Sequence, residues 1–316
     1  MNEDQLIQTF FQRKNQDNSV DLGIGDDAAV LSVLEGYSLV TSIDTLLEGR
    51  HFPKNYSPIA IAQRSVAVSV SDLAAMGAIP KWLTISISLP DFEADWLGQF
   101  SEALHESLSH YQMSLVGGDT IKGPLSITLN VMGIVEQGKA LQRNTAQIGD
   151  DIYITGTVGG AANALYQMLA GELIDDDLRK CFDKPQARVG IGRDLIDVAH
   201  ACMDISDGVL LDLKRLLTAS RMGAKIELTH IPLHPSLQVY KHDLQMNLMC
   251  GGDDYELLFT AAKDQRAIVE SLSQQYALPI KRVGEVTAEK ELQCFVKGKV
   301  VLPEQLGLKN LGYQHF

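Results

Sequence analysis

Hydrophobic and polar residues along the first half of the chain follow the patterns of short strands and amphipathic helices. Apolar residues recur at helical spacing from Leu6 to Phe11 and predict a short first helix. The same reasoning predicts strands at 28–33, 37–43, 82–89 and 125–135, and helices at 58–76 and 95–111. Gly77 follows the helix at 58–76, at the position where glycine commonly ends a helix. The first half is therefore expected to mix helices with strands.

The second half shows the same mixture after a polar, glycine-containing stretch at 137–151. Strands are predicted at 152–155, 224–228 and 255–261, and helices at 209–220 and 265–275. We therefore expect two α/β or α+β domains, with mixed sheets flanked by helices. The expected domains are residues 1–140 and residues 141–316.

Length, composition and charge narrow the class of protein. A chain of 316 residues with 45% hydrophobic residues is typical of a globular protein of two domains. The net charge of −13 argues against a nucleic-acid partner, which requires clustered Lys and Arg. The segment 1–4 is acidic, and the longest apolar stretch, 59–80, is interrupted by Arg64 and Asp72. We therefore expect no signal peptide, no membrane span and a cytoplasmic protein.

Aspartates beside glycines, or at the ends of apolar segments, are the main chemical signal in the sequence. These residues are Asp26, Asp27, Asp44, Asp72, Asp119, Asp204, Asp207, Asp253 and Asp254. Each one alone is better explained by a turn or by a helix N-cap than by a functional site. As a set, they occupy positions that the strand ends of a sheet would bring into one crevice.

Several carboxylates in one crevice require cations. Two carboxylates about 4 Å apart repel by roughly 4 kcal/mol at an effective dielectric constant near 20. The cysteines and histidines have no spacing typical of a zinc site, so the ligands would be oxygens, which select Mg²⁺, Mn²⁺ or Ca²⁺. Aspartates with Mg²⁺ beside glycine-rich turns are typical of proteins that handle phosphates.

Other candidate motifs are weaker. Residues 133–139 approach a Walker A loop, but Ala140 replaces its hydroxyl residue and no helix follows, so we reject this reading. The glycine-rich stretch 156–160 lies between a strand and a helix, where it is either an anion-binding loop or a tight turn. His51 follows the Asp44 segment and is the histidine with the best claim to a functional role.

Five ordered motifs together resemble the thiamine-monophosphate kinase family. They are GIGDDA at 23–28, SDLAAMGA at 71–78, GGDT at 117–120, DISDG at 204–208 and GDDYEL at 252–257, with a matching Gly-Tyr at 312–313. The family is part of the superfamily of aminoimidazole ribonucleotide synthetase and selenophosphate synthetase. The resemblance implies that superfamily's two-domain fold, a homodimer built through the N-terminal domains, and ATP in a cleft between the domains. It also implies Mg²⁺-assisted transfer of the γ-phosphoryl group of ATP to thiamine monophosphate, giving thiamine diphosphate.

The resemblance also implies roles for individual residues. The metal-binding residues would be Asp27, Ser42, Ile43, Asp44, Asp72, Asp119, Asp204 and Asp207. The residues in contact with ATP would be Gly118, Asp119, Arg143, Ser206 and Tyr111, and those in contact with thiamine monophosphate would be His51, Asp253 and Tyr313. Asp207 and Arg143 would have the catalytic roles. Ile43 stands where the family often has Thr, and Asp253 stands where Glu is usual.

The expected chemistry needs no general base. The acceptor is a phosphate monoester whose second pKa is near 6, so an ionised oxygen is available at neutral pH. We therefore predict direct in-line transfer without a phosphoenzyme. The alternatives are another ATP-dependent synthetase of the same superfamily, a maturation protein that binds nucleotide or metal without kinase activity, or aspartates that merely cap turns.

Overall fold

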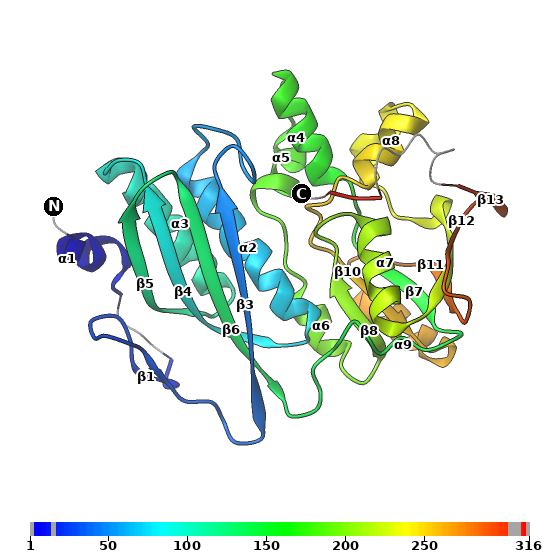
Figure 1. Cartoon of the computed structure of the whole chain (residues 1–316), viewed down its shortest axis with the longest axis horizontal. Coiled ribbons are helices and arrows are strands. Elements are labelled where there is room, and N and C mark those ends of the chain that lie inside the picture. Colours follow the sequence, from blue (N-terminus) through cyan, green and yellow to red (C-terminus); the bar gives the residue numbers. More distant parts are fainter. Residues whose placement is uncertain (1–2, 14–16, 303–310, 314–316) are drawn as a thin grey trace. The chain divides into compact units, whose positions relative to one another are not determined.

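The computed structural model describes residues 3–13, 17–302 and 311–313 and divides into two compact units (Figure 1). Unit 1 consists of Met1–Leu73 and Ala78–Gly138, and unit 2 consists of Ala74–Gly77 and Lys139–Phe316. The division after Gly138 lies two residues before the boundary expected from the sequence. Each unit has a β-sheet flanked by helices, which confirms the predicted fold class.

Unit 1 is built on a four-stranded sheet with the order β3-β6-β4-β5. Strands β4 and β5 are parallel, whereas the β3–β6 and β4–β6 pairs are antiparallel. The elements are α1 (Glu3–Leu6), the π-helical turn η1 (Ile7–Phe11), β1 (Val20–Leu22), β2 (Val30–Leu31), β3 (Tyr37–Leu47), α2 (Pro58–Ala75), β4 (Ile79–Leu89), α3 (Ala94–His110), β5 (Ser114–Lys122) and β6 (Ser126–Glu136). The short strands β1 and β2 form a separate antiparallel pair.

Helices α2 and α3 cover one face of this sheet (Figure 1). Both helices bury apolar side chains at helical spacing, such as Leu97, Phe100 and Leu104 of α3. Gly77 follows α2 in the left-handed conformation, with φ of 69°, as predicted for a glycine that ends a helix. The helix predicted at 58–76 is therefore confirmed, within one residue at its end.

The sequence patterns miss strand β5. The expectation that Asp119 lies at a strand end is wrong, because Gly117, Gly118 and Asp119 lie inside β5. Glycine lowers the strand signal, because it has no side chain to contribute to a hydrophobic pattern. Asp44 is likewise inside β3, which continues to Leu47 because it pairs with β6 over its whole length.

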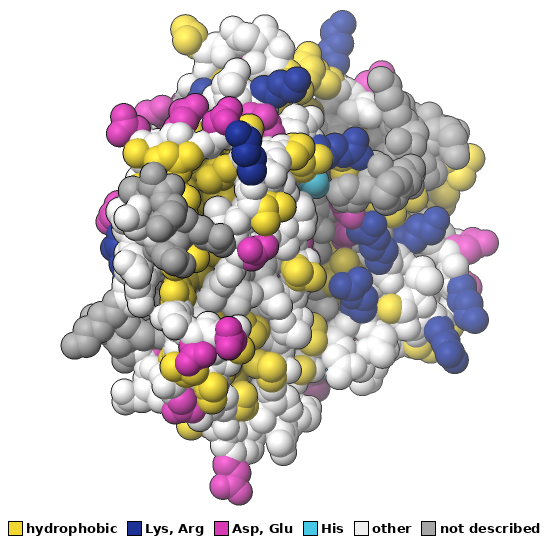
Figure 2. Space-filling view, turned by 60° about the vertical axis from the view of Figure 1, so that its left-hand side comes forward, with side chains coloured by type: hydrophobic (Ala, Val, Ile, Leu, Met, Phe, Trp, Pro, Cys, Tyr) yellow, Lys and Arg dark blue, Asp and Glu magenta, His cyan; other side chains and the backbone are white. Residues whose placement is uncertain are grey.

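Strand β3 has one covered face and one exposed face. Its side chains alternate, since successive residues of a strand point to opposite sides of the sheet. Leu39, Ile43 and Leu47 are 50%, 64% and 41% exposed, whereas Leu46 is buried. Hydrophobic side chains also appear at the surface among charged ones on the face shown in Figure 2.

Unit 2 is built on a seven-stranded sheet with the order β13-β12-β9-β11-β7-β10-β8. Its pairs are antiparallel except for the parallel pair β12–β9. Its helices are α4 (Gly160–Ala170), α5 (Asp176–Asp183), α6 (Val189–Asp194), α7 (Val209–Ser220), α8 (His242–Met249) and α9 (Arg266–Gln275), with 3₁₀ turns η2 (Leu228–His230), η3 (Pro235–Val239) and η4 (Lys263–Gln265). Its strands are β7 (Asp151–Thr155), β8 (Ala199–Asp204), β9 (Gly223–Glu227), β10 (Leu257–Ala261), β11 (Ile280–Thr287), β12 (Leu292–Val296) and β13 (Lys299–Val301).

The seven-stranded sheet has a hydrophobic core on each face. Ile152 and Ile154 of β7 pack in one core, which contains the apolar side chains of α7. Tyr153 points to the other face, where it packs with residues of α6 and α9. This alternation is the pattern of a strand buried on both sides, and it explains why the sequence of β7 is almost continuously apolar.

None of the helices in the described residues is long and apolar enough to cross a membrane. All four cysteines, which lie in the described part of the chain, are free thiols. Cys202, Cys250 and Cys294 are buried, and burial raises the pKa of the Cys294 thiol to about 11.

A buried ion pair fixes the segment before β10. Glu256 accepts hydrogen bonds from Nε and Nη2 of Arg188 at 2.8 and 2.5 Å, and from the hydroxyl of Thr155 at 2.6 Å. The Glu256 side chain is 6% exposed. A Cβ at Gly156 would lie 1.9 Å from its Oε1, so the turn after β7 requires glycine at this position.

We expect Arg188→Met to destabilise unit 2 by about 3 kcal/mol, because it leaves the buried Glu256 carboxylate without its cation. The double variant with Glu256→Gln should recover part of this loss, since a neutral amide costs less to bury. Urea denaturation followed by circular dichroism measures the free energy of unfolding of the single and the double variant. A loss below about 1 kcal/mol in the single variant would show that the pair contributes little.

Candidate active site

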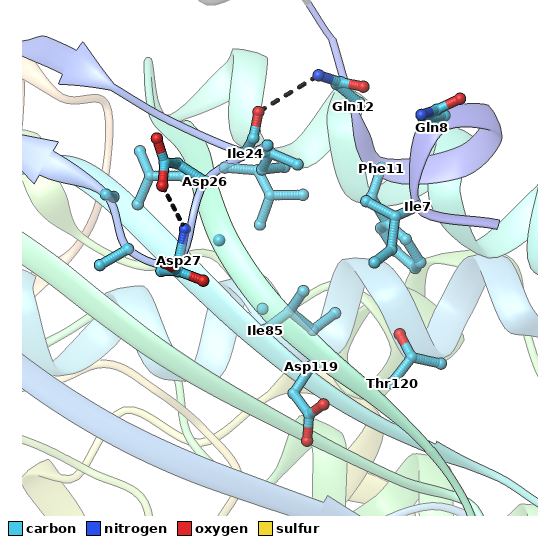
Figure 3. A pocket seen from close by; sticks show the side chains of 17 residues that line it. Ile7, Gln8, Phe11, Gln12, Ile24, Asp26, Asp27, Ile85, Asp119 and Thr120 are labelled. Carbon is cyan, nitrogen blue, oxygen red and sulfur yellow. Dashed lines mark hydrogen bonds between the residues drawn. The ribbon is translucent and has the colours of Figure 1, made fainter. Parts of the chain in front are cut away.

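A pocket in unit 1 lies beside the edge strand β5. It is lined by η1, by the loop between β1 and β2, and by residues 115–120, and it encloses about 660 Å³. Two predicted metal ligands, Asp27 and Asp119, line this pocket together with Asp26 (Figure 3). The predicted ATP-binding residue Gly118 lines it as well. The fold thus brings residues from separate motifs to one cavity.

Local hydrogen bonds shape the loop that carries Asp27. The Asp26 carboxylate accepts a hydrogen bond from the amide of Asp27 at 2.8 Å. The side-chain amide of Gln12 donates to the carbonyl of Ile24 at 3.3 Å, which ties the loop to the end of η1 (Figure 3). Gly25 has φ of 125°, a conformation that L side chains rarely adopt, so the glycine permits the sharp turn before the two aspartates.

Gly118 has a packing role that is independent of any ligand. A Cβ at this position would lie 2.2 Å from the carbonyl oxygen of Ile85 on the neighbouring strand β4. Strands β4 and β5 therefore approach each other too closely for a side chain at 118. The close approach explains why glycine occurs inside this strand.

A second group of predicted ligands lies between β3 and α2. The hydroxyl of Ser42 donates a hydrogen bond to the carboxylate of Asp72. Burial, and after it the negative charge of Asp72, raises the pKa of Asp44 to about 6, although the nearby Ser69 hydroxyl acts in the opposite direction. Ile43 directs its side chain to the opposite, exposed face of β3, so the side chain takes no part in this group.

The sheet sets the spacing between the two groups of unit 1. Asp44 is opposite Leu129, Leu129 is opposite Ile85, and Ile85 is opposite Gly118, so Asp44 and Gly118 lie at the same level of the sheet. They occupy its two edges and are separated by three strand spacings, roughly 14 Å. Among the described residues, no three histidine, cysteine, aspartate or glutamate side chains are placed to hold one metal ion. Within unit 1 the predicted ligands therefore form smaller groups than expected.

The residues of the second group fit a hard divalent cation. Their donor atoms are carboxylate and hydroxyl oxygens, which are the donors that Mg²⁺ takes in proteins. Burial and the charge of Asp72 disfavour the ionised form of Asp44, and a bound cation would favour it. Mg²⁺ would be held by Asp44, Asp72 and Ser42, and waters or phosphate oxygens would complete its coordination.

Two further predicted residues of unit 1 lie outside these groups. His51 follows β3, where its Nδ1 accepts a hydrogen bond from the amide of Leu47 at 3.0 Å. This contact leaves Nε2 as the hydrogen-bearing nitrogen of the neutral ring. Tyr111 ends α3, with its ring edge-on to that of His110, and is not among the residues that line the pocket beside β5. Its role in ATP binding stays a prediction.

In unit 2 the predicted residues gather around the loop between β8 and α7. Asp204 is the last residue of β8 and is buried. Ser206 and Asp207 follow immediately, and Gly208, with φ of 114°, precedes the first turn of α7. The prediction that these aspartates lie at a strand end is confirmed here.

The two predicted substrate residues of unit 2 are joined to this loop by backbone hydrogen bonds. The amide of Asp253 donates to the carbonyl of Ser206 at 2.8 Å, and the amide of Tyr313 donates to the carbonyl of Asp207 at 2.8 Å. Asp253 has a left-handed backbone with φ of 65°, and the Tyr255 hydroxyl donates to its Oδ1 at 3.1 Å. Three separate segments of the chain thus converge on residues 206–208.

Arg143 is exposed and lies in a segment that is fixed through its backbone. The Ser220 hydroxyl donates to the carbonyl of Arg143 at 2.9 Å and accepts from the amide of Ala146 at 3.2 Å. The amide of Cys202 donates to the carbonyl of Gln142 at 3.0 Å. The backbone at Arg143 is therefore held while its guanidinium extends into solvent, where it is available to a ligand.

The glycine-rich stretch 156–160 already binds a carboxyl group of the chain. The amide of Gly159, directly before α4, donates to Oδ1 of the buried Asp254 at 2.7 Å. Burial raises the pKa of Asp254 well above its ordinary value, although this hydrogen bond acts in the opposite direction. Because the Gly159 amide is already used by this carboxyl group, the tight-turn interpretation of the stretch is favoured over phosphate binding.

Two residues of this region were missed by the sequence reasoning. Oδ2 of the buried Asp212 accepts hydrogen bonds from the amides of Ser206, Asp207 and Gly208, at 3.0, 2.9 and 3.1 Å. Arg215 donates to Asp207 and, at 2.7 Å, to Oδ1 of Asp212. The sequence signal was present, because an aspartate in the first turn of a helix is placed to bind the preceding loop amides.

Comparison with known proteins identifies the family. The family models of AIR synthase related protein match residues 25–135 with the N-terminal domain and residues 147–297 with the C-terminal domain. The thiamine-monophosphate kinase of Haemophilus influenzae is 40% identical over 294 residues, which cover 90% of this chain and 89% of that protein. The chain belongs to the thiamine-monophosphate kinase family.

Solved structures support this assignment. The crystal structure of thiamine-monophosphate kinase from Stenotrophomonas maltophilia is 38% identical, with a TM-score of 0.85, and the match covers 90% of this chain and 93% of that one. The structure of AaThiL complexed with AMPPCP and TMP is 28% identical, with a TM-score of 0.78, and the match covers 99% and 95% of the two chains. The resemblance inferred from the motifs is therefore confirmed for the thiamine-monophosphate kinase family.

We expect Asp44→Asn to raise the thermal stability of this thiamine-monophosphate kinase family member at pH 8 without divalent cations. The folded-state pKa of Asp44 is raised, so the folded protein binds this proton more tightly than the unfolded chain, and stability falls as pH rises from about 4 to about 6. A shift of about two pKa units corresponds to at most about 3 kcal/mol, which a neutral amide would recover.

Melting curves at pH 8 with and without Mg²⁺ measure this effect. Mg²⁺ should raise the melting temperature of the wild type much more than that of Asp44→Asn. Asp91→Asn removes an exposed carboxylate that pairs with Lys122, so it serves as the matched control and should change little. Equal or lower stability of Asp44→Asn at pH 8 would contradict the electrostatic account of this pair.

Proposed function

We propose that the chain catalyses transfer of the γ-phosphoryl group of ATP to the phosphate of thiamine monophosphate, which produces thiamine diphosphate. The observation that carries this proposal is the pair of carboxylates, Asp44 and Asp72, held together inside a member of the thiamine-monophosphate kinase family. A pair of acidic side chains with a raised pKa is typical of a site that takes a cation. The solved relative complexed with AMPPCP and TMP supports the two substrates.

The proposal assigns Mg²⁺ to oxygen ligands in both units. Asp27, Asp119, Asp44, Asp72 and Ser42 would supply them in unit 1, and Asp204 and Asp207 in unit 2. The role implied for Ile43 would rest on its backbone, because its side chain points to the other face of β3. Bound Mg²⁺ would neutralise the charge of the phosphates and so allow two polyanions to approach.

The chain's own residues would bind and orient the substrates. Gly118, Ser206 and Tyr111 would contact ATP. The support for Tyr111 is the weakest of the three, because Tyr111 is not among the residues that line the pocket beside β5. The exposed guanidinium of Arg143 would stabilise charge on the transferred phosphoryl group. His51, Asp253 and Tyr313 would hold thiamine monophosphate, with Nε2 of His51 as a hydrogen-bond donor.

No general base is assigned, because none is needed. The acceptor phosphate is mostly dianionic at neutral pH and already presents an ionised oxygen. The chemical requirements are charge neutralisation and in-line alignment, which positioned ligands supply. We therefore propose direct transfer without a phosphorylated enzyme.

The proposal is tested by incubating the purified chain with ATP, Mg²⁺ and thiamine monophosphate and measuring thiamine diphosphate by chromatography. Asp207→Asn should lower kcat by about a hundredfold, which corresponds to about 3 kcal/mol of transition-state stabilisation. Lys281→Ala, which changes a surface residue of β11, is a control that should retain full activity.

The same assay distinguishes the alternatives. ADP release that depends on another acceptor would indicate a different synthetase of the superfamily. ATP binding that is indifferent to thiamine monophosphate would indicate a maturation protein. Full activity of Asp207→Asn would mean that the aspartate only caps its turn, and a labelled protein after incubation with γ-labelled ATP would contradict direct transfer.

We also propose a homodimer that forms through unit 1. This proposal is supported by the row of exposed hydrophobic side chains on the open face of β3, namely Leu39, Ile43 and Leu47. Exposed hydrophobic rows of this kind are typical of interaction surfaces. A cytoplasmic location and the absence of nucleic-acid and membrane partners stay predictions.

Sedimentation should give a mass of twice 34.6 kDa for the wild type. The double variant Leu39→Glu/Leu47→Glu should sediment as a monomer, because two charges would be buried in the interface. Leu173→Glu changes a leucine that is fully exposed in unit 2, so this control should stay dimeric. A dimer that persists in the double variant would place the interface elsewhere.

A further inference from the structure

The short loop of Ser206, Asp207 and Gly208, called here the 206–208 loop, is held on both sides of its backbone. Its three successive amides donate to one atom, Oδ2 of Asp212. Its carbonyls at Ser206 and Asp207 accept from the amides of Asp253 and Tyr313. A carboxylate that accepts three charge-assisted hydrogen bonds holds a loop more firmly than neutral partners would.

Close packing restricts the loop further. A Cβ at Gly252 would lie 2.4 Å from the carbonyl oxygen of Ser206, and a Cβ at Gly312 would lie 2.4 Å from that of Asp207. The glycines therefore allow two other segments to approach the loop backbone directly. A shift of the loop would be transmitted to Asp253 and Tyr313, because no flexible side chain lies between them.

Asp212 is itself fixed and is shielded from solvent. Its side chain is fully buried in the first turn of α7, and its Oδ1 accepts from Arg215 at 2.7 Å. Arg215 also pairs with Asp207, so it links the buried carboxylate to the predicted metal ligand. The two acidic side chains beside this arginine share one cation, which favours a defined position for both.

We propose that Asp212 is a positioning residue that couples the two substrate sites of unit 2. By holding the amides of the 206–208 loop, it fixes Ser206 and Asp207 toward ATP and, through the loop carbonyls, fixes Asp253 and Tyr313 toward thiamine monophosphate. The assignment of ligands to these residues rests on the proposed function. The mechanical coupling itself rests on the hydrogen bonds alone.

The test compares Asp212→Asn with Asp151→Asn. Asp151 is equally buried and pairs with Arg266 and Arg282. It begins β7 and lies opposite Ala261 of β10, about 13 Å along β10 from Leu257, which follows the Asp253 segment. Hydrogen exchange measured by mass spectrometry should increase in Asp212→Asn for peptides covering 205–209, 252–254 and 311–313. Asp151→Asn should leave these peptides unchanged.

Kinetics supply the second readout. In Asp212→Asn the KM values for ATP and for thiamine monophosphate should both rise about tenfold or more, because both sets of contacts lose their geometry. Asp151→Asn should lower the melting temperature and leave both KM values unchanged. Asp212→Glu retains the charge but displaces the carboxylate by one methylene, so it should show the same effects. It replaces Asp212→Asn in both experiments if Asp212→Asn does not fold.

The outcomes separate this proposal from the proposed function. Unchanged exchange of the 206–208 loop, a rise in one KM alone, or equal effects in Asp151→Asn would each overturn the coupling role of Asp212. A wild type that makes no thiamine diphosphate would overturn the proposed function, whereas the exchange experiment would still decide whether Asp212 holds the three segments together.

Discussion

Electrostatic repulsion between carboxylates inside unit 1 is the constraint on which the candidate site depends. The chain places Asp44 on β3 against Asp72 on α2, where burial and the second charge raise the pKa of Asp44 to about 6. Such an arrangement costs folding free energy at neutral pH, because ionisation of Asp44 is then unfavourable. A fold retains it where a ligand removes the cost, and oxygen donors at this spacing suit a divalent cation.

The buried carboxylates of unit 2 show the contrasting arrangement. Asp151 pairs with Arg266 and Arg282, Glu256 pairs with Arg188, and Asp212 pairs with Arg215. Each of these acids receives its cation from the chain itself, and each fixes local structure. Asp44 differs from these acids, because the strongest charge acting on it is that of another acid, Asp72. The second carboxylate beside the buried Asp44 is the physical basis for proposing a cation here.

Sequence reasoning recovers the parts of the fold in which one local signal dominates. Helix α7 was predicted with its observed bounds, since an apolar periodic segment follows an Asp-Gly turn. Strand β5 was missed, because Gly117 and Gly118 remove the alternation by which strands are recognised. The close approach of β5 to β4, which requires glycine at 118, is a tertiary contact that no local pattern reveals.

The same limit applies to the candidate site. The aspartates were selected as strand-end residues, and this holds for Asp204, whereas Asp44 and Asp119 lie inside strands. Their grouping follows from strand order and from which face of β3 meets α2, and both are set by long-range pairing. Asp212 carries a sequence signal, an acid in the first turn of a helix, but that signal does not show which three loop amides it binds.

The backbone at Asp253 gives a reason for the departure from the glutamate that is usual in the family. Asp253 has φ of 65°, in the left-handed region that aspartate adopts more readily than longer side chains do. Its amide bonds the 206–208 loop and its carboxylate accepts from Tyr255, so the residue is fixed at both ends. A short acid held in this way has little freedom to lose on binding, which offsets part of its shorter reach. The substitution is therefore compatible with the proposed substrate contact.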